Sequence, residues 1–133
     1  MKRLLALIIA FLATGGQAQV EGTSLQFAHV TSTEIADTEV ENGNLARVHL
    51  FPLELGGQDV PLNVIYIPIG MKDKWRKLIG TIEKFRTDGL IDKLKVVPEY
   101  NGASVVPCRI KFIGTHYTKW IGFEPVIAMW KCA

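Results

Sequence analysis

Three side chains between Leu45 and Pro68 are of types that could hydrolyse a phosphodiester. Arg47 lies two residues before His49, and Asn63 follows His49 by fourteen residues. An imidazole can act as the general base toward water, an amide oxygen can hold Mg²⁺, and a guanidinium can contact the phosphate. His49 and Arg47 are therefore candidate catalytic residues and Asn63 is a candidate metal ligand, with ordinary strand and turn roles as the open alternatives.

Two strands must position these residues. Residues 45–55 alternate well enough to predict one strand, with both candidate catalytic residues on the same side, and Gly56-Gly57 ends it. Residues 63–68 form a short β-branched and aromatic run, which predicts a second strand.

The clearest helix of the chain lies between Met71 and Arg86. Apolar residues recur there at three- and four-residue steps, which predicts a helix that buries one side against a sheet. The other side is basic and could contact nucleic acid. Its candidate binding residues are Lys72, Lys74, Arg76 and Lys77.

The end of the chain reads as three antiparallel strands, at residues 93–100, 103–114 and 119–130. Asn101-Gly102 is typical of a two-residue hairpin turn. A regular two-residue hairpin would mix apolar with charged residues on each face, so we predict a β-bulge near Pro98 or Pro107. Four basic residues then share the solvent face as a second candidate nucleic-acid surface: Lys93, Lys95, Arg109 and Lys111.

The chain begins with Lys2 and Arg3, an apolar run of ten residues and small residues up to Ala18. This order predicts a secretory signal peptide at residues 1–18. A membrane anchor is the alternative, but ten apolar residues fall short of the roughly 20 that cross a bilayer. No later segment is long and apolar enough to span. We expect residues 19–133 to form a single mature α+β domain, secreted or periplasmic.

Export also bears on the two cysteines, Cys108 and Cys132. An oxidising compartment favours a disulfide between them over two free thiols. Metal binding or a catalytic cysteine is the alternative, although no histidine lies at a zinc-ligand spacing from them.

The first part of the mature chain is its least regular and most acidic part. Residues 19–31 could hold one strand, and residues 32–44 are poorly periodic, so we expect a loose or edge-like segment there. Residues 19–59 carry seven acids and one Arg, whereas residues 60–133 carry twelve bases and six acids. The basic part could meet phosphates, or the asymmetry could serve only solubility.

Taken in chain order, these features resemble the compact secreted members of the DNA/RNA non-specific endonuclease family, of the ββα-metal superfamily. The segments that carry the resemblance are Arg47-Val48-His49-Leu50-Phe51, Leu55-Gly56-Gly57, Leu62-Asn63-Val64, Trp75 and Val96 to Gly102. The resemblance implies an antiparallel sheet with one main helix and a ββα-metal-like element. It also implies Mg²⁺ as cofactor and the site roles assigned above.

Three departures from that motif bear on activity. Val48 stands where the family has Gly and Ala46 where an Asp often stands, and the helix supplies Asp73 and Glu83 but no Asn or Gln to a metal shell. The leading hypothesis is a secreted, sequence-non-specific, Mg²⁺-dependent nuclease, which requires His49 and Asn63 to converge on one cleft. The alternatives are a non-catalytic exported protein on the same scaffold, binding nucleic acid or a protein partner, and an envelope or toxin-associated module with unrelated chemistry.

Overall fold

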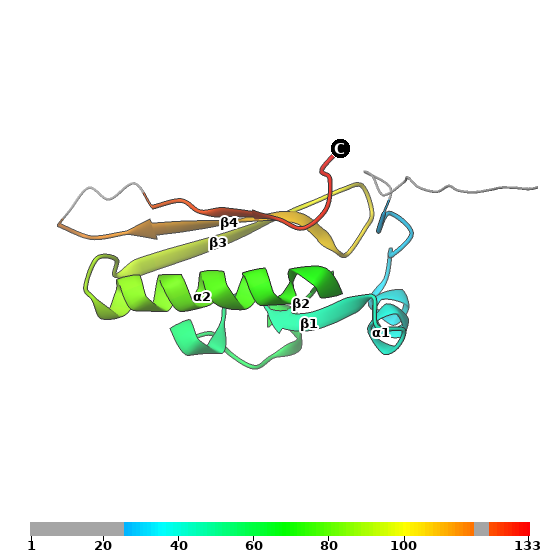
Figure 1. Ribbon diagram of the computed structural model, residues 1–133, viewed down its shortest axis with the longest axis horizontal. Coiled ribbons are helices and arrows are strands. Elements are labelled where there is room, and N and C mark those ends of the chain that lie inside the picture. Colours follow the sequence, from blue (N-terminus) through cyan, green and yellow to red (C-terminus); the bar gives the residue numbers. More distant parts are fainter. Residues whose placement is uncertain (1–25, 119–122) are drawn as a thin grey trace, which may run out of the picture.

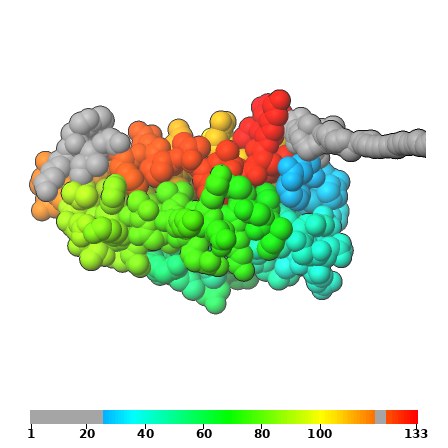
Figure 2. Space-filling model, viewed as in Figure 1, coloured from blue at the N-terminus to red at the C-terminus, as the bar shows by residue number. Residues whose placement is uncertain are grey.

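The computed structural model describes residues 26–118 and 123–133, which fold into two antiparallel sheets and two α-helices. The helices are α1 (Thr33–Glu41) and α2 (Lys72–Thr87), and the strands are β1 (Leu45–His49), β2 (Val64–Pro68), β3 (Lys93–Tyr100), β4 (Pro107–Thr115) and β5 (Val126–Ala128). β1 pairs with β2, and the second sheet has the order β3-β4-β5. Figure 1 shows α2 running alongside β3 and β4, with the β1–β2 pair near its other side, and Figure 2 shows the exposed side of α2 across one face. The predicted α+β class is confirmed.

α2 agrees with the sequence prediction to within a residue at each end. Its buried residues, Trp75, Ile79 and Ile82, form the apolar stripe, and the Trp75 ring lies 5.6 Å from the Phe112 ring of β4. The helix stops where Gly89 takes a φ of +77°, a backbone shape that glycine adopts at little cost. α2 therefore covers the inner face of the three-stranded sheet.

β1 and β2 form an antiparallel pair in which Leu45 lies opposite Pro68 and His49 opposite Val64. The sequence predicted one strand over residues 45–55, but β1 ends at His49. The predicted strand is therefore wrong over residues 50–55. Pro52 has no N–H to give to a ladder, and residues Leu53–Leu55 form a short 3-10 turn instead. The chain order β1, β2, α2 matches the expected strand–strand–helix element.

β3 and β4 contain the predicted bulge, between Glu99 and Tyr100 and opposite Pro107 and Arg109. The register puts Val96 opposite Phe112 on the inner face and leaves the four predicted basic residues on the outer face. The prediction of a two-residue loop at Asn101-Gly102 is wrong, because β3 ends at Tyr100 and β4 begins only at Pro107.

Tertiary bonds explain the longer connection between β3 and β4. The hydroxyl of buried Ser104 donates to the Phe27 carbonyl at 2.8 Å, and the Val105 N–H donates to the Val30 carbonyl at 2.8 Å. These bonds tie the connection to the N-terminal segment, so it cannot close as a tight turn after Tyr100.

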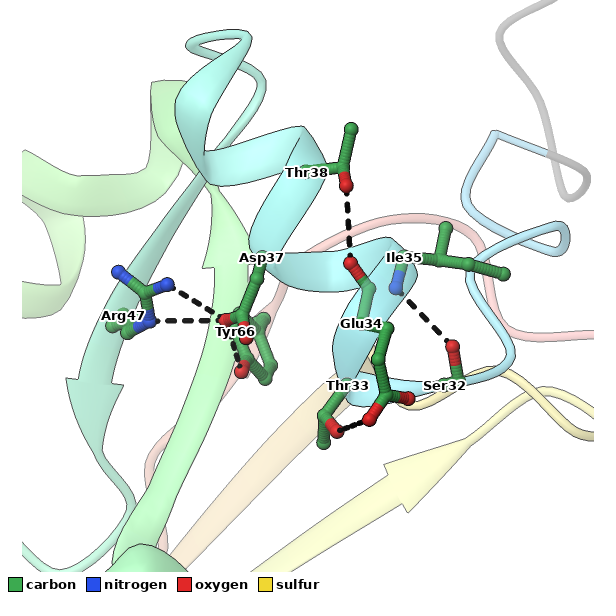
Figure 3. A network of polar contacts seen from close by, with 8 residues as sticks. All are labelled: Ser32, Thr33, Glu34, Ile35, Asp37, Thr38, Arg47 and Tyr66. Atoms are coloured by element: carbon green, nitrogen blue, oxygen red, sulfur yellow. Dashed lines mark hydrogen bonds and ion pairs between the residues drawn. The ribbon is translucent and has the colours of Figure 1, made fainter.

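α1 is the largest departure from the sequence prediction, which expected a loose segment over residues 32–44. The Ser32 hydroxyl accepts a hydrogen bond from the Ile35 N–H at 3.2 Å and caps the helix (Figure 3). Only Ala36 is buried within it, so periodicity gave little signal. The strand expected over residues 19–31 is also wrong over its described part, since residues 26–29 form turns; residues 19–25 lie outside the described part.

The C-terminal segment closes onto β4. The predicted disulfide between Cys108 and Cys132 is present, and the Trp130 indole N–H donates to the Val106 and Pro107 carbonyls at 3.2 and 3.0 Å. The strand expected over residues 119–130 is shorter, because β5 covers only three residues and positions 119–122 lie outside the described part.

Two predictions concern export. The predicted signal peptide, residues 1–18, lies outside the described residues. Among the residues that are described, no helix has the length and apolar character needed to cross a membrane. The disulfide is consistent with an oxidising compartment, as export would provide.

The cap of α1 can be tested by Ser32→Ala, which removes the acceptor for the Ile35 N–H. We expect this substitution to lower the free energy of unfolding by about 1 kcal/mol in a urea titration. Thr33→Ala is the matched control, because within the described residues the Thr33 hydroxyl bonds only the neighbouring, exposed Glu34, at 3.5 Å. Equal stability of Ser32→Ala and the parent would contradict the cap.

Candidate functional site

Four of the predicted site residues line one hollow of about 240 Å³ between the end of β1 and the first turns of α2. β1 supplies Arg47 and His49, and α2 supplies Lys72 and Arg76. Glu54, from the turn after β1, adds one carboxylate to the lining. The floor is partly apolar, because the buried side chains of Trp75 and Ile79 also line it. Cationic side chains thus outnumber acids among the residues that line the hollow.

His49 has an acidic partner that the sequence did not single out. Its Nε2 lies 3.0 Å from the Asp59 Oδ1, and its side chain is 29% exposed while that of Asp59 is 79% exposed. A carboxylate can only accept a hydrogen bond. Asp59 therefore favours the tautomer of His49 that carries its proton on Nε2 and its lone pair on Nδ1. The ten-residue separation between Asp59 and His49 gave no signal, because the chain between them is irregular.

Arg47 is held by a network that joins α1 to the first sheet (Figure 3). Its Nε and Nη2 both donate to the Asp37 Oδ1, at 3.2 and 2.7 Å, and the Tyr66 hydroxyl donates to the same oxygen at 2.7 Å. The hydrogen bonds from Tyr66 and then Arg47 lower the pKa of Asp37 below its ordinary value. The same carboxylate raises the pKa of Arg47 and so keeps it charged.

Asn63 lies in a different place from the other predicted site residues. Its amide oxygen accepts from the Phe51 N–H at 2.8 Å, and its NH₂ group donates to the Phe51 and Gln58 carbonyls at 2.9 and 2.8 Å. Asn63 lines a second hollow with Val60 and Leu62, not the one that contains His49. The structure therefore does not bring the side chains of Asn63 and His49 to one cleft. The Asn63 amide instead closes the connection between β1 and β2.

The Gly-Gly break belongs to that same connection. A Cβ on Gly57 would stand 1.8 Å from the Phe51 carbonyl oxygen, so only glycine fits there, and Gly56 has a φ of +100°. Both glycines are thus needed for the path of the chain between β1 and β2.

Magnesium is implied by the family resemblance alone. In the described part of the chain, no three or more His, Cys, Asp or Glu side chains group where they could hold a metal ion. The Asn63 amide is engaged by three main-chain hydrogen bonds. Metal ligation by Asn63 stays a prediction.

The remaining predicted binding residues lie on two separate surfaces. Lys74 and Lys77 are exposed on α2, whose other side packs on the inner face of the three-stranded sheet. The outer face of that sheet carries the second basic group, in which Arg109 is held by two hydrogen bonds to Glu99, at 3.0 and 2.7 Å. The two basic surfaces therefore point to different sides of the molecule.

Compared with known proteins, the chain matches no family model, no curated protein and no solved structure. The resemblance to the non-specific endonuclease family therefore stays a prediction from motif order. What the chain can do must be judged from the geometry of the hollow.

The role of Asn63 can be tested through stability. Asn63→Ala leaves the Phe51 N–H and two carbonyls without their partner, so we expect a loss of about 2 to 3 kcal/mol in the free energy of unfolding. The measurement is a urea titration. Gln58→Ala is the matched control, because the bond to Gln58 uses only its main-chain carbonyl. An Asn63→Ala protein as stable as the parent would show that the amide does not close this connection.

The Asp37 network predicts a pH dependence. The pKa of Asp37 is lowered from its ordinary value of 3.8, first by Tyr66 and then by Arg47. The carboxylate therefore contributes stability that is fully present above 3.8 and is lost as the pH falls through the lower, folded-state pKa. We expect Tyr66→Phe to be less stable than the parent at neutral pH, with a difference that shrinks in acid, measured by urea titrations down to about pH 2.

A matched control for this experiment is Tyr100→Phe. It removes a hydroxyl whose pKa is raised by burial. Its effect on stability should be the same at neutral and acidic pH. A Tyr66→Phe effect that is equally constant would contradict the link to Asp37.

Proposed function

We propose that the protein binds nucleic acid and takes up phosphate groups in the hollow between β1 and α2. The observation that supports this is the convergence of Arg47, Lys72 and Arg76 with His49 on one hollow, whose lining includes one carboxylate, that of Glu54. Guanidinium and ammonium groups are the side chains that bind phosphate, Arg through its planar fork and Lys as a point charge.

Lys72 is the cation best placed to accept a phosphate. Within the described ranges its ammonium has no acid at ion-pair distance, whereas Arg47 pairs with Asp37 and Arg76 with Asp73. The Arg76–Asp73 pair is exposed, with side chains 69% and 82% accessible. Such a pair contributes only about 0.2–1 kcal/mol, so Arg76 can exchange Asp73 for a phosphate at little cost.

The surface around the hollow extends its positive charge along the helix. Lys74 and Lys77 are exposed on the same element, and neither forms an ion pair with any residue in the described ranges. Charges of one sign along a groove attract a polyanion over about a Debye length, roughly 8–10 Å at ordinary salt. A nucleic-acid backbone lying along α2 could therefore place one phosphate in the hollow and others beside the helix.

This proposal corresponds to the non-catalytic alternative drawn from the sequence, since binding requires neither a metal nor a chemical step. The signal peptide, where it is cleaved, would make this an exported nucleic-acid-binding protein. Mg²⁺-dependent cleavage stays the prediction of the family resemblance alone.

A protein partner is the second candidate function. Leu62 is 98% exposed in the 3-10 turn Pro61–Asn63 that precedes β2, near Val60, which is 41% exposed. A large apolar side chain held out by a fixed loop is a feature of protein-recognition surfaces. Leu62→Glu separates the two candidates: it should leave nucleic-acid affinity unchanged and remove any protein partner that co-purifies with the parent.

The proposal predicts that Lys72→Glu weakens nucleic-acid binding by roughly tenfold at about 0.1 M salt, because a phosphate contact is lost. The slope of log affinity against log salt should also fall by about one. The measurement is fluorescence anisotropy of a labelled single-stranded oligodeoxynucleotide over a salt series.

Lys131→Glu is the matched control, since it makes the same charge change at an exposed residue outside the hollow. An equal loss in both variants would mean that net charge, not the hollow, sets affinity. A loss confined to Lys95→Glu would assign binding to the outer face of the three-stranded sheet. A parent that does not bind even at low salt would refute the proposal.

A further inference from the structure

We infer that His49 and Asp59 cleave RNA without a metal ion, with His49 as the general base and Asp59 as its positioning residue. This inference rests on the proposed binding of nucleic acid in the hollow and names the substrate class for that site. It differs from the sequence-level hypothesis in the nucleophile, which is the ribose 2′-hydroxyl and not a metal-bound water.

The geometry around His49 suits a base held in one orientation. His49 ends β1, where its main chain pairs with Val64, and its partly buried side chain lines the cationic hollow. Asp59 holds the Nε2 at 3.0 Å and so leaves the Nδ1 lone pair as the base. A base, an orienting carboxylate and adjacent cations are the parts that acid–base cleavage of a phosphodiester requires.

Asn63 acts on this pair indirectly. Its NH₂ group donates to the carbonyl of Gln58 at 2.8 Å, and Gln58 directly precedes Asp59 in the chain. The amide therefore fixes the segment that carries Asp59. The residue predicted as a metal ligand has a supporting role in a site that uses no metal.

The chemical step is complete without a metal ion. His49 Nδ1 takes the proton of the ribose 2′-hydroxyl, the 2′-oxygen forms a bond to phosphorus, and the bond from phosphorus to the 5′-oxygen breaks. The 5′-oxygen takes a proton from water, and the hydroxide that remains takes the proton from His49. Lys72 and Arg76 balance the charge on the phosphorane. The products are a 2′,3′-cyclic phosphate and a 5′-hydroxyl.

The substrate class follows from this step. DNA lacks the 2′-hydroxyl, so it should bind in the hollow and remain intact, whereas RNA should bind and be cleaved. Binding can therefore be measured on DNA and cleavage on RNA. A failure of the proposed binding is thus distinguishable from a failure of the inferred cleavage.

The test incubates the purified full-length mature protein in EDTA with a labelled RNA oligonucleotide and a DNA oligonucleotide of the same sequence. We expect cleavage of RNA alone, with a 2′,3′-cyclic phosphate end identified by mass spectrometry. His49→Ala should slow cleavage by about 10²- to 10⁴-fold, and added imidazole should restore part of the rate. Asp59→Asn should slow it by roughly tenfold or more, and Asp59→Glu should retain most of it.

His29→Ala is the matched control, because His29 also faces a carboxylate, that of Glu39 at 3.7 Å, but does not line the hollow. Its rate should equal that of the parent. A slower rate of His49→Ala, prepared in the same way, excludes a contaminating ribonuclease as the source of cleavage. DNA and RNA binding without RNA cleavage would overturn this inference and leave the proposed function standing. Cleavage only with Mg²⁺, or equal cleavage of DNA and RNA, would also overturn it.

Discussion

Burial of one side of α2 against β4 is the constraint on which the other features of the molecule depend. Trp75 and Ile82 are buried in that interface, and the Trp75 ring packs on Phe112. Each fully buried large apolar side chain contributes about 1.5–3 kcal/mol, so the helix cannot turn about its axis without a large loss. At 3.6 residues per turn, an inward Trp75 also fixes Lys72 and Arg76 beside the end of β1. The cationic hollow is thus a consequence of core packing.

The connection between β1 and β2 depends on a second, polar constraint. Residues 50–63 lack regular structure apart from two short 3-10 turns, and loops of this length are usually functional or stabilised by bonds of their own. Here the Asn63 amide closes the connection with three hydrogen bonds, and Gly57 fits where no Cβ could. The closure thereby holds the segment that carries Asp59, because the Asn63 amide bonds the carbonyl of the preceding residue, Gln58.

The parts of the fold that could be predicted from sequence are those whose signals are local. α2 carries its apolar period within sixteen residues, and the bulge beside Pro107 follows from the alternation of two adjacent strands. α1 was missed because Ser32 and its cap form the helix with little burial. The hairpin after Tyr100 was predicted too short because Ser104 bonds Phe27, which is 77 residues away in the chain. The turn propensity of Asn101-Gly102 is local, whereas the bond from Ser104 to Phe27 is tertiary and cannot be read from the sequence.

In the candidate site, too, individual residues could be predicted from sequence but their grouping could not. Residue type identified Arg47 and His49, and the basic side of the helix was visible, but no local pattern could show that Lys72 and Arg76 meet them in one hollow. Asp59 was missed for the same reason.

Asn63 shows that residue type alone does not decide a role. An Asn oxygen can ligate a cation or accept an N–H, and here its oxygen accepts an N–H while its two donors are taken by carbonyls. A metal generates a nucleophile from water, whereas RNA carries its own in the 2′-hydroxyl. An oriented base beside fixed cations is the arrangement on which the inference of RNA cleavage rests.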